Sequence, residues 1–184
     1  AYEIIPSLVG SEMCIRDSGC TSVGLLKQLG AWQAVTAMRT APYRRLETWE
    51  WASSRVAFDA VSLGLPELGF MVENRILQLA LWQQFAQCAN LTLLCPARLQ
   101  SLQRADNAWQ LTLDGGETLQ TRLVVGADGA NSQVRKLAAI GTNGWQYRQA
   151  CMLITVDTGA PQQDVTWQRF FPSGPRAFLP LYDS

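Results

Sequence analysis

A short apolar run that ends in a glycine-flanked aspartate constrains the fold of this 184-residue chain most. Leu123 to Val125 contains no polar residue, as a strand buried on both faces of a sheet requires. Asp128 follows between Gly126 and Gly129, and Ser132 to Ala139 then predicts a short helix. A strand, a tight turn and a helix in this order are typical of open α/β sheets, which bind ligands at the carboxyl ends of their strands.

The composition excludes several kinds of site. The chain is 48% hydrophobic, which is enough for a buried core, and Lys plus Arg and Asp plus Glu both total 15, so no net charge favours nucleic acid. No histidine is present, which excludes Ser-His-Asp and Cys-His catalysis, His-ligated zinc and a His general base. The five cysteines form no CxxC pair, so we expect free thiols used for packing, and no metal site.

The sequence contains no run of about 18 apolar residues that would span a bilayer. Glu3, Pro6 and Glu12 interrupt the start of the chain, which therefore does not resemble a secretory signal. We expect a cytoplasmic protein whose contact with the inner membrane, if it has one, is peripheral.

The first eighteen residues, Ala1 to Ser18, show neither helical nor strand periodicity. They contain the string SLVGSEMCIRDS, which resembles translated adapter sequence from sequencing reads. Our hypothesis is that this segment is foreign and that native sequence begins near Gly19.

The spacing of apolar residues predicts alternating helices and strands in the first half of the chain. Two helices are expected between Thr21 and Met38, separated at Gly30. A helix from Asn74 to about Cys88, with Asn74 as its N-cap, is apolar nearly all round and is expected to be well buried. Strands are expected at Arg45–Ala52, Val56–Phe58 and Gly69–Val72.

The second half is predicted to be richer in strands. The turn Asp114-Gly115-Gly116 predicts a hairpin that joins Trp109–Leu113 to Thr118–Gln120. After Gly141 the periodicity changes to two, which favours an antiparallel sheet. Further strands are expected at Thr92–Leu94, Arg98–Gln103, Cys151–Val156, Val165–Phe171 and Ala177–Leu181.

The Asp128 turn has two interpretations from the residues alone. A carboxylate at this position can accept hydrogen bonds from sugar-like hydroxyls, and glycines on both sides let a ligand approach the backbone. In the alternative, Asp128 and Ser132 only satisfy backbone donors where the strand turns into the helix.

The longer string GADGANSQVR resembles the GADGxxSxVR signature of flavoprotein monooxygenases of the para-hydroxybenzoate hydroxylase type. Within that family, SVGLLKQLGAW, PYRRLETWEW, GFMVENRILQLALW and GPRAFLPL are similar to the ubiquinone-biosynthesis hydroxylases, so the resemblance extends from Cys20 to Ser184. It implies an α/β fold with a partial, Rossmann-like FAD-binding domain over residues 19–140. A sheet inserted at about 43–68 would belong to the substrate side, and residues 141–184 would begin an antiparallel substrate domain.

The activity that this resemblance implies is hydroxylation of the ring of a polyprenylated benzoquinol, with FAD as cofactor and NAD(P)H and O2 as co-substrates. It also implies complexes with other ubiquinone-biosynthesis proteins. A non-catalytic flavin-fold protein that binds a prenylated lipid or acts as a scaffold is the alternative. A reductase of the glutathione-reductase type is disfavoured, because the chain has no CxxxxC pair.

For the cofactor, the resemblance points to the turn and to the helix expected at 74–88. It assigns Gly126, Asp128 and Gly129 to the ribityl chain of FAD, and it adds Arg135, whose alternative role is a surface charge. Asn74 stands where many relatives carry an arginine near the cofactor; because it is not that arginine, we expect an N-cap role for it, with contact to the cofactor as the alternative. Gln78, one helical turn on, is a candidate to face the flavin.

For the substrate, the resemblance points to the sheet. Trp49 and Trp51 share a strand face that would contact the ring or its prenyl tail, and Phe178 and Pro180 would lie toward the ring pocket. Ordinary packing in the core of the sheet is the alternative for all four. No catalytic residue is assigned.

Parts of the family pattern are missing from this sequence. The family begins with a strand and a GxGxxG phosphate loop, which the chain lacks, and Cys14 aligns where the family has an early arginine. The second FAD signature, a GD segment, would lie beyond Ser184. We therefore expect the chain to be inactive by itself and the full-length protein to be the enzyme.

Overall fold

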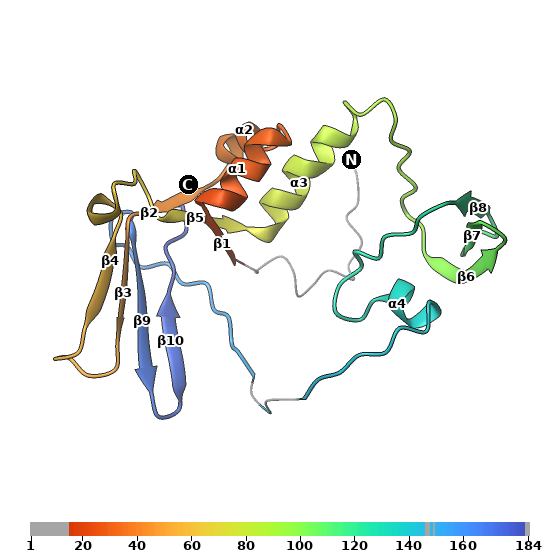
Figure 1. Cartoon of the computed structure of the whole chain (residues 1–184). Coiled ribbons are helices and arrows are strands. Elements are labelled where there is room, and N and C mark those ends of the chain that lie inside the picture. Colours follow the sequence, from red (N-terminus) through yellow and green to blue (C-terminus); the bar gives the residue numbers. More distant parts are fainter. Residues whose placement is uncertain (1–14, 146–147, 149, 183–184) are drawn as a thin grey trace. The chain divides into compact units, whose positions relative to one another are not determined.

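The computed structural model describes residues 15–145, 148 and 150–182. The chain divides into two compact units, one formed by residues up to 91 together with residues from 152 onward, and the other by residues 92–151. Figure 1 labels the helices and strands of both units. The mixture of helices with antiparallel and mixed sheets confirms the predicted fold class.

A three-stranded sheet lies at the centre of the first unit. Its strand order is β1 (Ile15–Gly19), β5 (Gly69–Glu73) and β2 (Ala41–Tyr43), and both pairings are antiparallel. Gly69 has to be a glycine, because a Cβ at this position would come within 2.8 Å of the carbonyl oxygen of Ser18 and within 3.0 Å of the Tyr43 ring. The close approach of β5 to both neighbours therefore excludes a side chain here.

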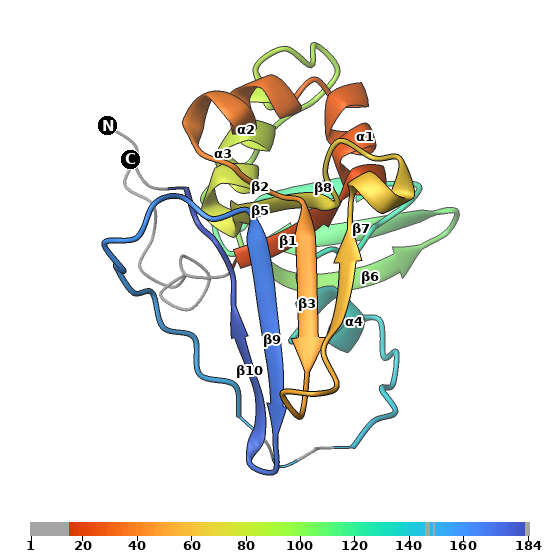
Figure 2. The same ribbon diagram turned by 90° about the vertical axis from the view of Figure 1, so that its left-hand side faces the viewer.

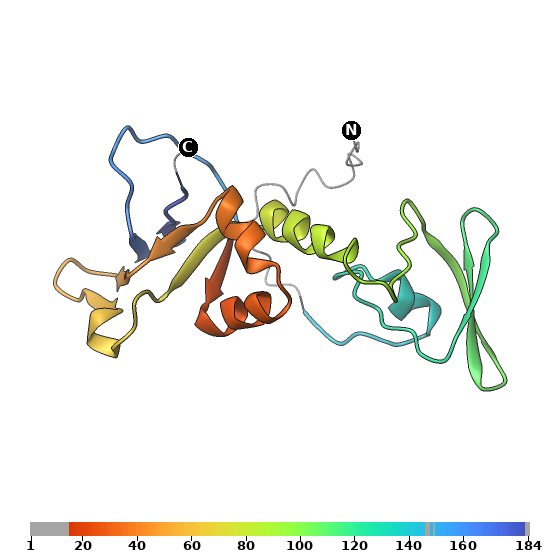
Figure 3. The ribbon, with the colours of Figure 1, turned by 90° about the horizontal axis from the view of Figure 1, so that it is seen from above.

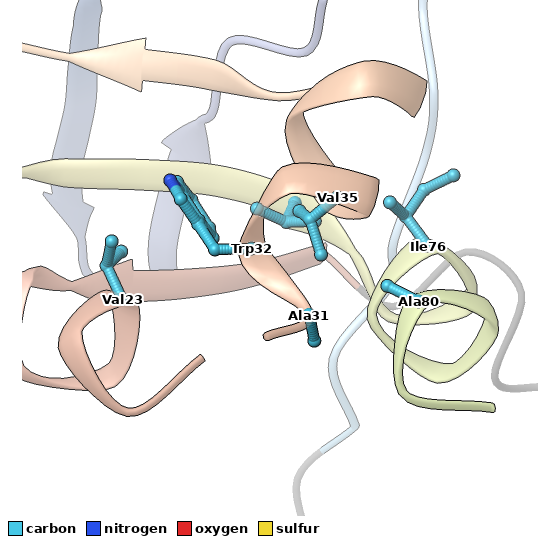
Figure 4. Packing of buried hydrophobic residues seen from close by; sticks show 7 residues of the cluster. Val23, Ala31, Trp32, Val35, Ile76 and Ala80 are labelled. Carbon is cyan, nitrogen blue, oxygen red and sulfur yellow. The ribbon is translucent and has the colours of Figure 1, made fainter. Parts of the chain in front are cut away.

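Three helices pack beside β5. They are α1 (Cys20–Gln28), α2 (Trp32–Met38) and α3 (Asn74–Phe85), and Gly30, with a φ of +72°, separates the first two as predicted. Figure 4 shows the core that they form with β5. Its buried members are Val23, Ala31, Trp32, Val35, Val72, Ile76 and Ala80. Apolar residues from four elements exclude water together, which accounts for the stability of this layer.

The same unit contains a four-stranded sheet in the order β10-β9-β3-β4. Its strands are β3 (Arg45–Trp49), β4 (Val56–Asp59), β9 (Val165–Phe171) and β10 (Gly174–Phe178). Figure 2 shows β3 and β9 side by side and running in the same direction, whereas the two outer pairings are antiparallel. Segments more than 100 residues apart in the sequence therefore share one sheet.

The second unit contains a three-stranded antiparallel sheet, drawn in green in Figure 3, and one helix. The strands are β6 (Leu99–Ala105), β7 (Ala108–Leu113) and β8 (Thr118–Thr121), and the helix is α4 (Gln133–Leu137). Gly116 adopts a φ of +80° in the turn between β7 and β8, as the predicted hairpin requires.

Three predicted strands do not form. Leu123 to Val125, Thr92 to Leu94 and Cys151 to Val156 have no regular structure, and Leu123 and Val125 are 72% and 75% exposed. A continuous apolar strand depends on neighbouring strands for its hydrogen bonds and on covering layers for its burial. Among the residues that the structure describes, no strand pairs with any of these three runs.

Two predictions for α3 were wrong. The helix begins with Glu73, not Asn74, at the N-cap position, and no side chain caps it. The Glu73 carboxylate pairs with Arg39 at 3.1 Å instead. Only Ile76 and Ala80 of this helix are buried, and Trp82 is 42% exposed, because the helix packs on one side only.

The hypothesis of a foreign segment concerns residues that lie mostly outside the described part, since residues 1–14 are not described. Residues 15–19 form β1 and pair with β5. The hypothesis stays a prediction, as does the division into FAD-binding and substrate domains.

Cys20, Cys88, Cys95 and Cys151 are free thiols as predicted, but they are exposed, so the packing role expected of them was wrong for these four. Within the described ranges, no helix combines the length and the apolar character needed to cross a bilayer.

Candidate functional site

Asp128 lies at the centre of a hydrogen-bonded turn that starts α4. One carboxylate oxygen, Oδ1, accepts a hydrogen bond from the hydroxyl of Ser132. The other, Oδ2, accepts from the backbone N–H groups of Gln133 at 2.6 Å and Val134 at 3.1 Å. The carboxylate thus satisfies donors at the first turn of the helix, which have no partner within a helix.

Ser132 and Arg135 close the same turn. The Ser132 hydroxyl oxygen accepts from the Arg135 backbone N–H at 3.0 Å, which makes Ser132 the N-cap residue of α4. The Arg135 guanidinium reaches back and donates to the carbonyl of Ala130 at 2.8 Å. The side chains of Ser132 and Arg135 therefore fix the loop between Asp128 and α4.

These hydrogen bonds favour the ionised form of Asp128. The hydroxyl of Ser132, and after it the N–H of Val134, lower the pKa of the Asp128 carboxyl from 3.8 to about 2. The side chain is nevertheless exposed to solvent. A permanently charged carboxylate with open access is an acceptor for hydroxyl donors at any physiological pH.

The two positions that flank Asp128 require glycine for different physical reasons. A Cβ at Gly126 would lie 3.0 Å from the Val134 side chain, so this glycine lets α4 pack closely on the turn. Gly129 has a φ of +80°, a conformation that residues with a Cβ rarely adopt, and a Cβ there would meet no other atom within 4 Å. The space beside Gly129 is therefore open for another molecule.

The turn fits one part of FAD, the polyol chain. An ionised carboxylate can accept about four hydrogen bonds, and Asp128 receives three from the protein, so acceptor capacity remains for a hydroxyl. The pyrophosphate of FAD needs a row of backbone N–H groups, as in a GxGxxG loop, and the sequence contains no such loop.

The other candidate cofactor residues belong to the first unit. Asn74 is the first residue of α3 and is half-buried, and Gln78 is exposed on the same helix. The described site therefore consists of Gly126, Asp128, Gly129 and Arg135, which the structure brings together in one turn.

The candidate substrate residues lie in or near the four-stranded sheet, where none is buried. Trp49 ends β3 and is half-buried, whereas Trp51 follows the strand and is 67% exposed, so the two do not share a strand face as predicted. Phe178 ends β10 at 63% exposure, and Pro180 is half-buried beyond it. Core packing is therefore excluded for Trp51 and Phe178 in the described structure, whereas Trp49 and Pro180 are partly buried and both interpretations stay open for them.

Sequence reasoning missed a buried charge in the same sheet. Glu47 is only 8% exposed, and the guanidinium groups of Arg45 and Arg55 hold its carboxylate at 2.8 and 3.0 Å. The signal was present in the sequence, because Arg45 and Glu47 are two residues apart and must point to the same face of a strand.

The structure thus places an exposed, charged carboxylate at a glycine-flanked turn before a helix. Residues 18–179 match the model of the FAD binding domain family, and the chain belongs to that family. This confirms the resemblance identified from the GADGANSQVR string.

Similar proteins include a demethoxyubiquinol hydroxylase and a ubiquinone biosynthesis monooxygenase. The chain is 53% identical over 184 residues to the 3-demethoxyubiquinol 3-hydroxylase of Escherichia coli (strain K12), and the match covers 99% of the chain and 47% of that protein. It is 35% identical to the human mitochondrial ubiquinone biosynthesis monooxygenase COQ6, covering 89% of the chain and 37% of that protein. The chain thus spans half or less of the length of these relatives.

Solved structures share the fold at lower identity. Klebsiella pneumoniae HpxO, complexed with FAD and uric acid, has a TM-score of 0.66 and 14% identity, covering 92% of the chain and 44% of that protein. The Pseudomonas aeruginosa protein PqsL, described as a probable FAD-dependent monooxygenase, has a TM-score of 0.62 and 23% identity, covering 73% of the chain and 38% of that protein. These likenesses support the fold.

Proposed function

We propose that the chain is part of an FAD-dependent monooxygenase that hydroxylates the ring of a polyprenylated benzoquinol in ubiquinone biosynthesis, with NAD(P)H and O2. The Asp128 turn is the observation that carries this proposal, because its charge and access suit a flavin's polyol chain. Relatives that are named as a 3-demethoxyubiquinol 3-hydroxylase and as a ubiquinone biosynthesis monooxygenase support the choice of substrate.

Bound FAD would supply the redox chemistry that inserts an oxygen atom into the ring. The protein's task is then to hold the cofactor and to orient the substrate. Asp128 would accept a hydrogen bond from a ribityl hydroxyl, and Gly129 would let the chain of the cofactor approach the backbone. Arg135 holds the loop from Ala130 in place and thereby keeps Asp128 oriented.

The substrate would lie against the four-stranded sheet, with Trp49, Trp51, Phe178 and Pro180 as candidate contacts. Aromatic side chains offer flat apolar surfaces for a quinol ring and a branched prenyl tail. A prenylated substrate resides in a lipid bilayer, so we further propose peripheral contact of the full-length protein with the inner membrane. Complexes with other enzymes of ubiquinone biosynthesis and a cytoplasmic location complete the proposal.

The experiment uses the full-length protein. Purified protein is mixed with a demethoxyubiquinol, NADH or NADPH, and air-saturated buffer, and the products are separated by mass. We expect a product heavier by one oxygen atom and consumption of NAD(P)H that depends on the quinol. Bound FAD without any hydroxylated product would contradict the proposal and favour a non-catalytic flavin-fold scaffold.

A genetic test is independent of purification. Deletion of the full-length gene should cause one unhydroxylated ubiquinone precursor to accumulate, and a plasmid copy of the gene should remove it. Normal ubiquinone content in the deletion strain would contradict a role in this pathway.

A further inference from the structure

Glu47 bridges two parts of the four-stranded sheet. Its Oε1 accepts from Arg45 Nε at 2.8 Å within β3, and its Oε2 accepts from Arg55 Nη1 at 3.0 Å just before β4. Arg45 also lies 3.6 Å from the carboxylate of Asp59. We call these four residues the Glu47 network. Both oxygens of Glu47 are occupied, so its charge serves to fix the two guanidinium groups.

Arg55 links this network to an aromatic ring. Its guanidinium carbon lies 4.3 Å from the centroid of the Trp49 ring, in a cation–π contact. A guanidinium group is planar, so it can pair with a carboxylate along its edge while it stacks on an indole. The buried carboxylate of Glu47 therefore orients Arg55, and Arg55 orients Trp49.

Trp49 belongs to an aromatic face of the sheet. The parallel register places Glu47 beside Trp167 and Trp49 beside Arg169, and the next pairing places Trp167 beside Phe178. Register partners point to the same face, so Trp49, Trp167 and Phe178 share the face that carries Glu47. Figure 2 shows β3, β9 and β10 lying next to one another in this order. Phe178 remains 63% exposed on this face.

The charge on this face is unusual for ordinary packing. Only the Glu47 carboxylate loses most of its hydration, because the Arg45 and Arg55 side chains are 42% and 50% exposed, and ion pairs with such exposed partners stabilise a fold little. An apolar residue at position 47 would fill the space but would not fix the direction of Arg55. The Glu47 network therefore suits orientation of the indole more than it suits stability.

We propose that Glu47 and Arg55 are positioning residues that hold Trp49 against the prenyl tail of the quinol substrate. This inference rests on the proposed function and adds the residues that set the enzyme's preference for a prenylated substrate. A fixed indole loses little conformational freedom when an apolar chain packs on it, so orientation before binding raises affinity for the tail. On this proposal, Trp49 contacts the prenyl tail and leaves the quinol ring to the other candidate residues.

The test compares a prenylated quinol with a tailless one in the full-length enzyme. Trp49→Ala should lower kcat/KM for the prenylated quinol about tenfold through KM, as expected for loss of one well-packed aromatic contact, with the tailless quinol unchanged within about twofold. Arg55→Met should act in the same direction and on the same substrate. Because Arg55 acts through Trp49, the double variant should be no worse than Trp49→Ala alone.

Further variants separate orientation from stability. Glu47→Gln keeps the shape but removes the charge, and should give a smaller loss for the prenylated quinol only. Arg55→Lys keeps the charge but lacks the flat guanidinium group, so its activity with the prenylated quinol should be as low as that of Arg55→Met. If Arg55→Met does not fold, Arg55→Lys takes its place in the comparison. Arg104 stacks on Trp109 at 5.8 Å in the other unit, so Arg104→Met is the matched control and should match wild type with both substrates.

Three outcomes would overturn the inference. Equal losses with both quinols would indicate a structural role, and additive losses in the double variant would show that Arg55 does not act through Trp49. Variants indistinguishable from an active wild type would contradict the inference alone. A wild-type protein that turns over neither quinol would contradict the proposed function, and the inference with it.

Discussion

Helix α2 packs into a buried core built from distant parts of the chain, whereas the start of α4 is fixed by hydrogen bonds from residues next to it in the sequence. Trp32 and Val35 of α2 pack against Val72 of β5 and Ile76 of α3. In α4, the capping hydrogen bonds run between Asp128 and Arg135, a segment of eight residues that includes the cap and the helix start. The first arrangement depends on burial, and the second on hydrogen bonds that solvent can reach.

This difference indicates which region can bind a ligand. The core around α2 is closed, since its buried side chains already contact one another and leave no room for a cofactor. The Asp128 turn is open, because its carboxylate is ionised and exposed while its position is fixed by the protein. A binding site needs both fixed geometry and access, and only the second region combines them.

The largest predicted effect is on the buried layer. Trp32→Ala removes an indole that is 9% exposed and contacts the Phe70 ring at 4.9 Å between centroids. We expect a loss of about 3–5 kcal/mol in the free energy of unfolding of the full-length protein, measured by urea denaturation. Trp51→Ala, at an exposed position, is the control and should change stability by less than about 0.5 kcal/mol. Similar losses in both variants would contradict the assignment of the core.

A smaller effect is predicted for the cap of α4. Ser132→Ala removes the N-cap hydroxyl and one hydrogen bond to Asp128. The expected cost is about 1 kcal/mol, and it should appear as faster hydrogen exchange at the amides of Gln133, Val134 and Arg135. Exchange that also accelerates across α2 would show that the two regions are not independent.

The smallest effect concerns pH. The pKa of Asp128 is lowered by folding, so its contribution to the stability of the turn is fully present above pH 3.8 and is lost as the pH falls toward about 2. An NMR titration of the Gln133 and Val134 amides from pH 5 to about 2 should follow this change. In Asp128→Asn the change in amide chemical shift between pH 5 and about 2 should disappear. A change that persists would show that another group titrates there.

The same contrast explains what the sequence could predict. Helices α1 and α2, their break at Gly30 and the β7–β8 hairpin follow from local periodicity and turn residues, and all were predicted correctly. Asp128, Gly129 and Ser132 were identified because the turn is local.

Features that depend on distant partners were harder to predict. The Leu123 to Val125 run was expected as a buried strand, but a strand needs neighbours that a short segment does not specify. The parallel pairing of β3 with β9, and with it the surroundings of Glu47, joins residues over 100 positions apart. Local patterns indicate the strands but carry no information on which of them become neighbours.

The flavin content of an Asp128 variant tests the central claim most directly. Full-length wild type, Asp128→Ala and the control Glu117→Ala, an exposed carboxylate of the same unit, are purified in parallel, and FAD is measured by absorbance after release from the protein. Loss of a charged hydrogen-bond acceptor should weaken FAD binding about tenfold or more, so Asp128→Ala should emerge largely without flavin. Glu117→Ala should match wild type. Full flavin content in Asp128→Ala, with FAD affinity equal to wild type on titration, would contradict the account.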